Sequence, residues 1–314
     1  MKKLIKIELV DDSVIRINYV MTGSCTYSCR YCPDYLNNRQ HLPIDLDSLK
    51  NLFNKFSNRK IVLTLTGGEC TTHPQFREVL ELANELKINV AVDTNGVRTK
   101  RFYEEHKDLV GNWNFTLHPS QHTLDLTKIS CLTDSSFVVV LISMDPDHWE
   151  RSIDWYNQVL KLQNIKIIPI QLISNWGGAD CEIQYNKEQE EFLLSNKPTL
   201  NFTDKRKEEL LKSHSWLMDT DSVSYFDDGS KSIVDPFFLI KENTNVFTGW
   251  KCYSGSSAIL LNPDGSVSWG NCGIKKYKNY SEIDTKELML PVTCTLKSCD
   301  CGTDIRSTKF IDDQ

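Results

Sequence analysis

The chain has 314 residues, of which 40% are hydrophobic and 25% charged, and its net charge is -6. This length is sufficient for one large α/β domain and a smaller one, because single cores stop growing at about 250–300 residues. The composition excludes a disordered or fibrous class, and an acidic balance without a basic stripe argues against a nucleic-acid partner.

The N-terminal residues do not have the pattern of a signal peptide. Met1–Lys6 is followed by Glu8, Asp11 and Asp12 before any long apolar run. No stretch approaches the roughly 18 uninterrupted apolar residues of a membrane span. We therefore expect a cytoplasmic protein that has no membrane partner.

Short β-branched runs alternate with amphipathic stretches from residue 14 to residue 172, which is typical of repeated βα units around a parallel sheet. The predicted strands are Val14–Val20, Ile61–Thr66, Asn89–Thr94, Trp113–Leu117, Ser136–Ser143 and Ile165–Leu172. The predicted helices are Leu46–Phe56, Phe76–Leu86, Thr99–Lys107 and His148–Leu162. Because six units are too few for a closed eight-stranded barrel, we expect an α/β fold with a partial (βα)6, TIM-like barrel. Chemistry in such folds gathers at the carboxyl ends of the strands.

Three cysteines follow the first predicted strand, in the sequence Cys25-Thr-Tyr-Ser-Cys29-Arg-Tyr-Cys32. Three thiolates on one loop can bind three irons of a 4Fe-4S cluster, which normally takes four cysteines, and one iron then stays open to another ligand. A structural zinc site is the alternative, but it needs four protein ligands, and no nearby histidine or cysteine supplies the fourth. The spacing therefore predicts an iron-sulfur cluster with an open iron.

This C-x3-C-x2-C element, with the aromatic Tyr31 before its last cysteine, resembles the signature of the radical S-adenosylmethionine (SAM) enzymes. The resemblance implies that SAM binds the open iron through its amino and carboxylate groups. It further implies that an electron from the cluster, supplied by a donor such as flavodoxin or ferredoxin, cleaves SAM to a 5'-deoxyadenosyl radical. Such a radical would abstract a hydrogen atom from the substrate.

Further elements similar to those of this family follow the next three predicted strands. Gly67-Gly68-Glu69 resembles the motif that holds the methionine amino group, although Cys70 replaces the proline that is frequent there. Thr94-Asn95-Gly96 resembles the motif at the ribose side of the cofactor. His118 follows the fourth strand, where we expect it to contact cofactor or substrate. The predicted cofactor-binding residues are Tyr31, Gly67, Gly68, Glu69, Thr94, Asn95 and His118.

The sequence after residue 215 is rich in turns and cysteines. Hairpin signals at Asp227–Ser230 and Asn262–Gly265 indicate a small α+β domain. Its five thiols can close a second 4Fe-4S cluster with one to spare, and a zinc ribbon stays open as the alternative. The arrangement resembles the Twitch and SPASM extensions of radical SAM enzymes, which implies an auxiliary cluster. The predicted metal ligands are Cys25, Cys29, Cys32, Cys252, Cys272, Cys294, Cys299 and Cys301, and either Cys299 or Cys301 could be the spare thiol.

We expect residues 1–215 to form a radical SAM core and residues 216–314 an auxiliary iron-sulfur domain. The predicted function is a radical SAM enzyme of oxidoreductase or isomerase type that oxidises, cross-links or epimerises a peptide or a small carbohydrate-like substrate. Epimerisation would need a thiol that gives a hydrogen atom to the substrate radical, and Cys70, Cys181 and the spare C-terminal cysteine are candidates. The alternative is a non-catalytic iron-sulfur or zinc protein, an electron carrier or sensor, which leaves the Gly-Gly-Glu and Thr-Asn-Gly elements unexplained.

Overall fold

The computed structural model describes residues 2–175, 178–213 and 222–312, and the chain divides into two compact units. Unit 1 contains Met1–Tyr19, Ile44–Thr64 and Ser215–Gln314, and unit 2 contains Val20–Pro43 and Leu65–His214. Strands β2 (Val14–Thr22) and β3 (Lys60–Gly67) therefore contribute residues to both units. The predicted boundary at residue 215 lies outside the described residues, and the assignment of 1–215 and 216–314 to two domains stays a prediction.

Unit 2 is built mainly on parallel strands that are connected by helices. Besides the ends of β2 and β3, its strands are β4 (Asn89–Thr94), β5 (Asn112–Leu117), β6 (Phe137–Ser143), β7 (Ile165–Ile170) and β8 (Thr199–Asn201). The strands from β4 to β7 pair in parallel and in chain order, as repeated βα units do. β8 pairs antiparallel with β7 and is the last strand of its sheet, so the parallel strands do not close into a barrel.

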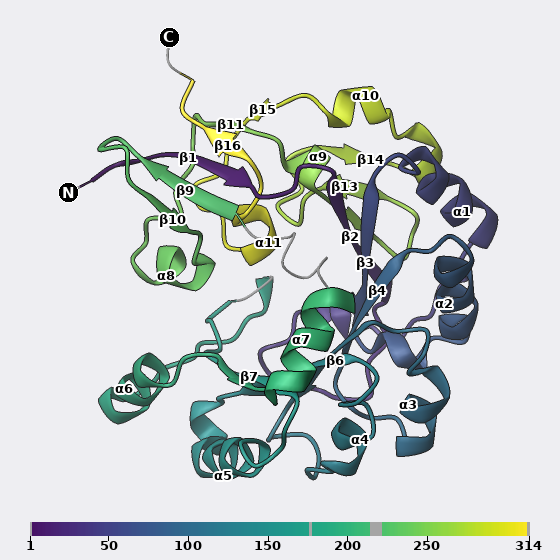
Figure 1. Cartoon of the computed structure of the whole chain (residues 1–314), viewed down its shortest axis with the longest axis vertical. Helices are drawn as coiled ribbons and strands as arrows, with labels where there is room; N and C mark the ends of the chain where they lie inside the picture. The colour runs from purple at the N-terminus through teal and green to yellow at the C-terminus, as the bar shows by residue number, and fades with distance from the viewer. Residues whose placement is uncertain (1, 176–177, 214–221, 313–314) are drawn as a thin grey trace. The chain divides into compact units, whose positions relative to one another are not determined.

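Helices α2 (Phe76–Glu85) and α5 (Trp149–Val159) of unit 2 each bury an apolar face. The other helices of this unit are α3 (Lys100–His106), α4 (Thr127–Ser130), α6 (Lys187–Ser195) and α7 (Asp204–Ser213), with the short 3-10 helices η1 (Asp34–Leu36), η2 (Cys70–Thr72) and η3 (Pro146–His148). In Figure 1, α2, α3, α4 and α5 follow the strands of this unit along one side. On α2, the helically spaced Phe76, Val79, Leu80 and Ala83 are all buried, which accounts for its amphipathic pattern.

Unit 1 contains a short parallel contact and an antiparallel sheet. Strand β12 (Ala258–Leu261) runs parallel to β2, and β13 (Val267–Trp269) and β14 (Lys276–Tyr277) continue from it in antiparallel pairs. The antiparallel sheet has the strand order β10-β9-β1-β16-β11-β15 (Figure 1). Its strands are β1 (Leu4–Leu9), β9 (Ser222–Phe226), β10 (Lys231–Ile233), β11 (Lys251–Cys252), β15 (Val292–Thr293) and β16 (Lys309–Phe310).

Both predicted hairpins form in unit 1. Gly229 and Gly265 have φ angles of 81° and 82°, a left-handed conformation that glycine adopts without strain. They lie between β9 and β10 and between β12 and β13. The helices of this unit are α1 (Leu46–Lys55), α8 (Pro236–Lys241), α9 (Ser254–Ser257), α10 (Thr285–Leu288) and α11 (Gly302–Ile305), with the 3-10 helix η6 (Tyr280–Glu282).

The predicted α/β fold is confirmed. The six predicted strands are β2 to β7, and the four predicted helices are α1, α2, α3 and α5. The largest difference is at α5, which ends at Val159 rather than at Leu162. In the described part of the chain, no helix is long and apolar enough to cross a membrane.

Candidate functional site

The three cysteines of the first motif lie on the loop after β2, which we call the cysteine loop (residues 23–32). Cys32 N donates to Cys29 O at 3.0 Å, so these two residues share a turn. Burial raises the pKa of all three thiols, to about 12 for Cys29 and about 11 for Cys32, and the neighbouring thiols raise the pKa of Cys29 further. The thiols are therefore protonated at neutral pH, and binding a metal would release their protons.

Two glycines allow the segment after β3 to approach the cysteine loop. Gly67 has a φ of 127°, and a Cβ added to Gly68 would lie 2.3 Å from Ser24 O. The backbone contact is closed by hydrogen bonds from Gly68 N to Thr22 O and from Glu69 N to Ser24 O, both of 2.8 Å. A side chain at either glycine would separate the two segments. The Gly-Gly pair thus fixes where the cysteine loop begins.

The carboxylate of Glu69 joins the second motif to the third. Glu69 is 1% exposed; its Oε1 accepts from Thr94 Oγ1 at 2.9 Å, and its Oε2 accepts from Asn95 N at 2.6 Å. Thr71 also donates to Oε1. Burial raises the pKa of Glu69, and these hydrogen bonds oppose the rise. Asn95 in turn donates from Nδ2 to Cys25 Sγ at 3.5 Å, so a chain of contacts connects Glu69 to the first cysteine.

His118 lies after β5 and contacts the cysteine loop. Its Nδ1 is 2.8 Å from Tyr31 Oη and 3.6 Å from Cys29 Sγ. Burial lowers the pKa of His118 to about 4, so the imidazole is neutral at pH 7. Its Nδ1 can accept from Tyr31 in one tautomer and donate to the Cys29 sulfur in the other. The end of β5 is thereby connected to the second cysteine.

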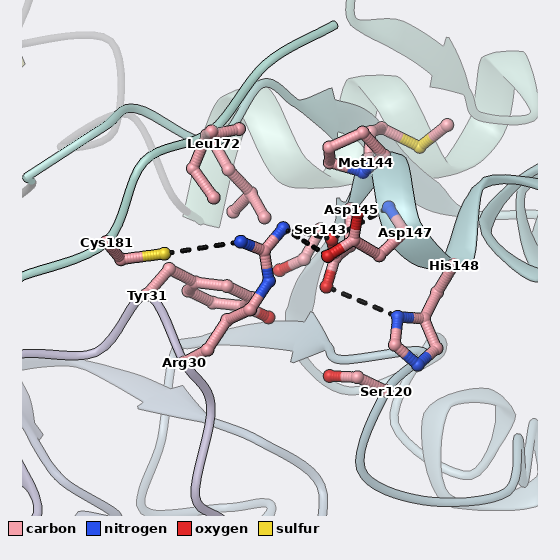
Figure 2. A network of polar contacts seen from close by, with 12 residues as sticks. Arg30, Tyr31, Ser120, Ser143, Met144, Asp145, Asp147, His148, Leu172 and Cys181 are labelled. Atoms are coloured by element: carbon pink, nitrogen blue, oxygen red, sulfur yellow. Dashed lines mark hydrogen bonds and ion pairs between the residues drawn. The ribbon is translucent and has the colours of Figure 1, made fainter.

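Arg30, which lies between the second and third cysteines, joins the cysteine loop to the end of β6. Its Nη2 is 3.0 Å from Asp145 Oδ1 and 2.9 Å from Asp147 Oδ2. The Asp145 side chain is 1% exposed, whereas that of Asp147 is 63% exposed. On its other side, Arg30 donates from Nη1 to Cys181 Sγ at 3.3 Å (Figure 2). The guanidinium of Arg30 therefore connects the cysteine loop, the end of β6 and the segment that contains Cys181.

The segment around Cys181 packs on the same loop. Cys181 and Ile183 form a buried cluster with Tyr31. Tyr185, which packs against that cluster, donates from Oη to Met144 O at 2.9 Å and so reaches the end of β6. Figure 2 shows Cys181, Tyr31 and Met144 around the guanidinium of Arg30.

Cys70 and Cys181, both predicted as possible hydrogen donors, have different surroundings. Cys70 is fully buried, and its thiol donates to Asp93 O at 3.2 Å. Burial raises the pKa of Cys70 well above its ordinary value. Cys181 is 9% exposed and lies beside the cysteine loop. Of these two thiols, Cys181 is the one placed near the first motif.

The five C-terminal cysteines gather within unit 1. Burial raises the pKa of Cys272 and of Cys299 to about 12, and Cys252 raises the pKa of both. The charge of Cys301 likewise raises the pKa of Cys299, and the charge of Cys294 raises the pKa of Cys252. Every one of the five thiols is thus close enough to another for its charge to be felt.

Both groups of thiols are of the ligand type that iron-sulfur clusters use. In residues 2–175, 178–213 and 222–312, no three His, Cys, Asp or Glu side chains are arranged so that they could hold a metal ion as they stand. The metal ligands therefore remain proposals. The gathering of the thiols, and the backbone contact at Gly68 that only glycine permits, support them.

Sequence reasoning missed three charged residues of these sites, Arg30, Asp145 and Lys309. Asp145 follows β6 closely, so the rule that places functional residues after strand ends could have found it. Arg30 and Lys309 give no such signal, because their partners are distant in the sequence.

The chain is similar to known proteins in part of its sequence and in its fold. Residues 19–127 match the model of the Radical SAM superfamily. The structure is similar to SuiB of Streptococcus suis bound to S-adenosylmethionine, with 13% identity over 87% of this chain and a TM-score of 0.54. It is also similar to native anSMEcpe with bound AdoMet and Kp18Cys peptide, with 13% identity over 88% of this chain and a TM-score of 0.50. No curated protein matches the chain.

These similarities have a definite extent. The chain spans 64% of the SuiB chain and 80% of the anSMEcpe chain, and at this identity the likeness establishes the fold. The superfamily match includes the cysteine loop, Glu69, Asn95 and His118. Residues 19–127 are therefore similar to the Radical SAM superfamily, and the chain has an α/β fold.

Proposed function

We propose that this protein is a radical SAM enzyme, in which Cys25, Cys29 and Cys32 hold a 4Fe-4S cluster. The observation that carries the proposal is the convergence of three strand-end motifs on the cysteine loop, with Asn95 against Cys25 and His118 against Cys29. The six βα units form the partial barrel that carries this loop. When bound, the cluster and SAM would together supply a 5'-deoxyadenosyl radical that abstracts a hydrogen atom from the substrate.

In this proposal the chain's own residues position and enclose the cofactor. Because both oxygens of Glu69 already accept hydrogen bonds, Glu69 fixes the Thr94–Asn95 segment, and the backbone of Gly67 and Gly68 is left to face the methionyl ammonium. Asn95 and the neutral His118 lie against ligand sulfurs, where they exclude water. Tyr31 packs with Cys181, and Cys29 packs against the same buried cluster, which shields this second cysteine from water.

We propose a peptide as the substrate. Two of the similar structures were solved with peptides, SuiB with the precursor peptide SuiA and anSMEcpe with the Kp18Cys peptide. The C-terminal cysteines hold a second 4Fe-4S cluster in this proposal, in the manner of a Twitch-like domain, and a flavodoxin or ferredoxin supplies electrons. The reaction is an oxidation, a cross-link or an epimerisation.

The first experiment is anaerobic reconstitution with iron, sulfide, SAM and dithionite. Release of 5'-deoxyadenosine that disappears in Cys29→Ala supports the enzyme. Cys131→Ala is the matched control, because Cys131 donates only to the nearby Lys128 O and belongs to neither group of thiols. A fully reconstituted wild-type protein that releases no 5'-deoxyadenosine would indicate the electron carrier instead.

Metal analysis tests the second cluster. Two 4Fe-4S clusters give about eight irons per chain, whereas a zinc ribbon gives about four irons and one zinc. The substrate is tested by incubating the loaded enzyme with a precursor peptide encoded beside its gene and measuring the peptide's mass. Sugar-pathway genes as neighbours, with turnover of a small carbohydrate, would contradict the peptide proposal.

A further inference from the structure

Lys309 is a lysine that is almost wholly removed from water inside unit 1. It is 1% exposed and lies in β16, between β1 and β11. Lysine is rarely buried to this degree unless its charge is compensated, because an isolated ammonium loses its hydration. The groups that surround its Nζ therefore indicate what the site is built to contain.

The contacts of the ammonium are with neutral groups. Nζ donates to the backbone oxygen of Asp304 at 2.8 Å and to Cys299 Sγ at 3.9 Å, and it lies 4.3 Å from the centre of the Phe247 ring. Among the residues that the structure describes, Lys309 forms no ion pair with a carboxylate. A carbonyl and an aromatic face offset only part of the desolvation of a full charge.

Asp304 is the nearby acid, but the backbone holds its carboxylate. Its Oδ1 accepts from Asn271 N at 3.0 Å, and its Oδ2 accepts from Cys272 N. The backbone therefore takes both oxygens of this carboxylate, and the described part of the chain shows no ion pair between it and the Lys309 ammonium.

Strand pairing places Lys309 directly opposite a cysteine. In the β11–β16 pair, Cys252 faces Lys309. Residues opposite each other in an antiparallel pair project from the same face of the sheet, with Cβ atoms about 5 Å apart. Cys252 is 8% exposed and Cys299 7% exposed, so two of the five C-terminal thiols share a buried space with this cation.

We propose that Lys309 is the internal counter-charge of the C-terminal thiolate site: its ammonium compensates the negative charge that Cys252 and Cys299 carry when they ligate a metal cluster. The inference rests on the proposed second cluster and adds a residue to it. It also assigns Cys299 as a ligand, because its sulfur is the one beside the ammonium, and leaves Cys301 as the spare thiol. Nearby charge is one of the factors that set the reduction potential of an iron-sulfur cluster.

The test uses the full chain with Cys25, Cys29 and Cys32 replaced by alanine, so that only the C-terminal cluster gives a signal. Lys309→Met removes the charge and keeps the length of the side chain, and Lys309→Arg keeps the charge. We expect Lys309→Met to lower the midpoint reduction potential in a titration followed by electron paramagnetic resonance. Iron loss to a chelator should be about tenfold faster, as is typical when a residue that supports metal ligands is removed. Lys309→Arg should stay close to the parent in both measurements.

If Lys309 had a purely structural role, Lys309→Met would lower the melting temperature of the metal-free protein. Under the proposal, a buried charge with neutral partners is unfavourable when no metal is bound. The metal-free Lys309→Met variant should therefore melt at the same temperature as its parent or higher. If a folded Lys309→Met chain loses all of its C-terminal iron, that outcome also supports the proposal. The proposal is overturned if Lys309→Met leaves the reduction potential and the rate of iron loss unchanged.

Failure of the proposed second cluster would look different. Wild-type protein would then hold about four irons, and Cys252→Ala would not change that number. In that case both Lys309 variants would also leave the iron content unchanged, and the second cluster, rather than the role of Lys309 alone, would be rejected.

Discussion

Nη2 of Arg30 lies 3.0 Å from Oδ1 of Asp145, and this contact fixes the middle of the cysteine loop to the end of β6. Arg30 is flanked by Cys29 and Tyr31, so a shift of its side chain moves a proposed iron ligand. Arg30 forms one ion pair with a buried carboxylate, that of Asp145, and one with an exposed carboxylate, that of Asp147. The pair with Asp145 is the one that water cannot replace.

We expect Asp145→Asn to lower the free energy of unfolding by about 1.5–3 kcal/mol, because it weakens a buried hydrogen bond to a charged group. Asp147→Asn is the matched control; its pair is exposed and should contribute less than about 1 kcal/mol. Urea unfolding of the metal-free variants measures both. Equal effects of the two substitutions would contradict the importance of burial at Asp145.

Gly68→Ala should destabilise the protein and weaken iron binding at the cysteine loop. The added Cβ would lie 2.3 Å from Ser24 O and 2.7 Å from Leu36 O, both backbone atoms that cannot rotate away. The cost of such overpacking is about 1–3 kcal/mol. Gly302→Ala is the control, since its Cβ would meet nothing closer than 3.6 Å. Melting temperature and iron content after reconstitution check the pair, and an unchanged Gly68→Ala would show that the close contact is not required.

Glu69→Gln tests the connection between the second and third motifs. An amide can accept at only one end, so its NH2 group would face a hydrogen-bond donor such as Asn95 N or Thr94 Oγ1. We expect a loss of about 1–3 kcal/mol in the free energy of unfolding. Glu81→Gln, which breaks an exposed pair with Arg77, should cost under about 1 kcal/mol. Chemical denaturation distinguishes the two, and similar values would argue against the buried network.

His122 should make stability depend on pH. Burial lowers its pKa from 6.5 to about 4, helped by Lys128 and Arg151, so between these values the unfolded chain binds a proton that the folded chain does not. Stability therefore rises with pH from about 4 to about 6.5 and is lost as the pH falls through this window.

His122→Phe keeps a ring against Tyr27 and Trp155 and removes the titration. The difference in unfolding free energy between wild type and variant should shrink by up to about 3 kcal/mol as the pH falls from 6.5 to 4. Because His122 also lowers the pKa of His118, the difference includes the effect of the substitution on that neighbour. A difference that is constant across the window would show that His122 titrates normally.

Strand positions and motif order could be predicted because they depend on local patterns. The run Asn89–Thr94 was predicted with both of its observed ends, since its β-branched and small residues are bounded by a turn and by Asn95-Gly96. The cysteine loop could be placed because C-x3-C-x2-C follows a strand. These features need only the period of the sequence and its turn residues.

Contacts between distant residues could not be predicted in this way. Arg30 and Asp145 are separated by 115 positions, and neither carries a local signal of the other. Lys309 looks like an ordinary charged residue near Asp312, and only its pairing between β1 and β11 makes it buried. Burial of a charge is a property of the assembled sheet, which a single sequence does not display.

The pairing of Ile7 with Lys309 in β1–β16 joins residues that are separated by almost the full length of the sequence. Closing so long a loop is entropically costly, and such contacts form late in folding. Since Lys309 also faces Cys252, the C-terminal thiol site matures only after this strand has docked. The contacts of the cysteine loop close shorter stretches of chain, such as the 70 positions between Cys25 and Asn95.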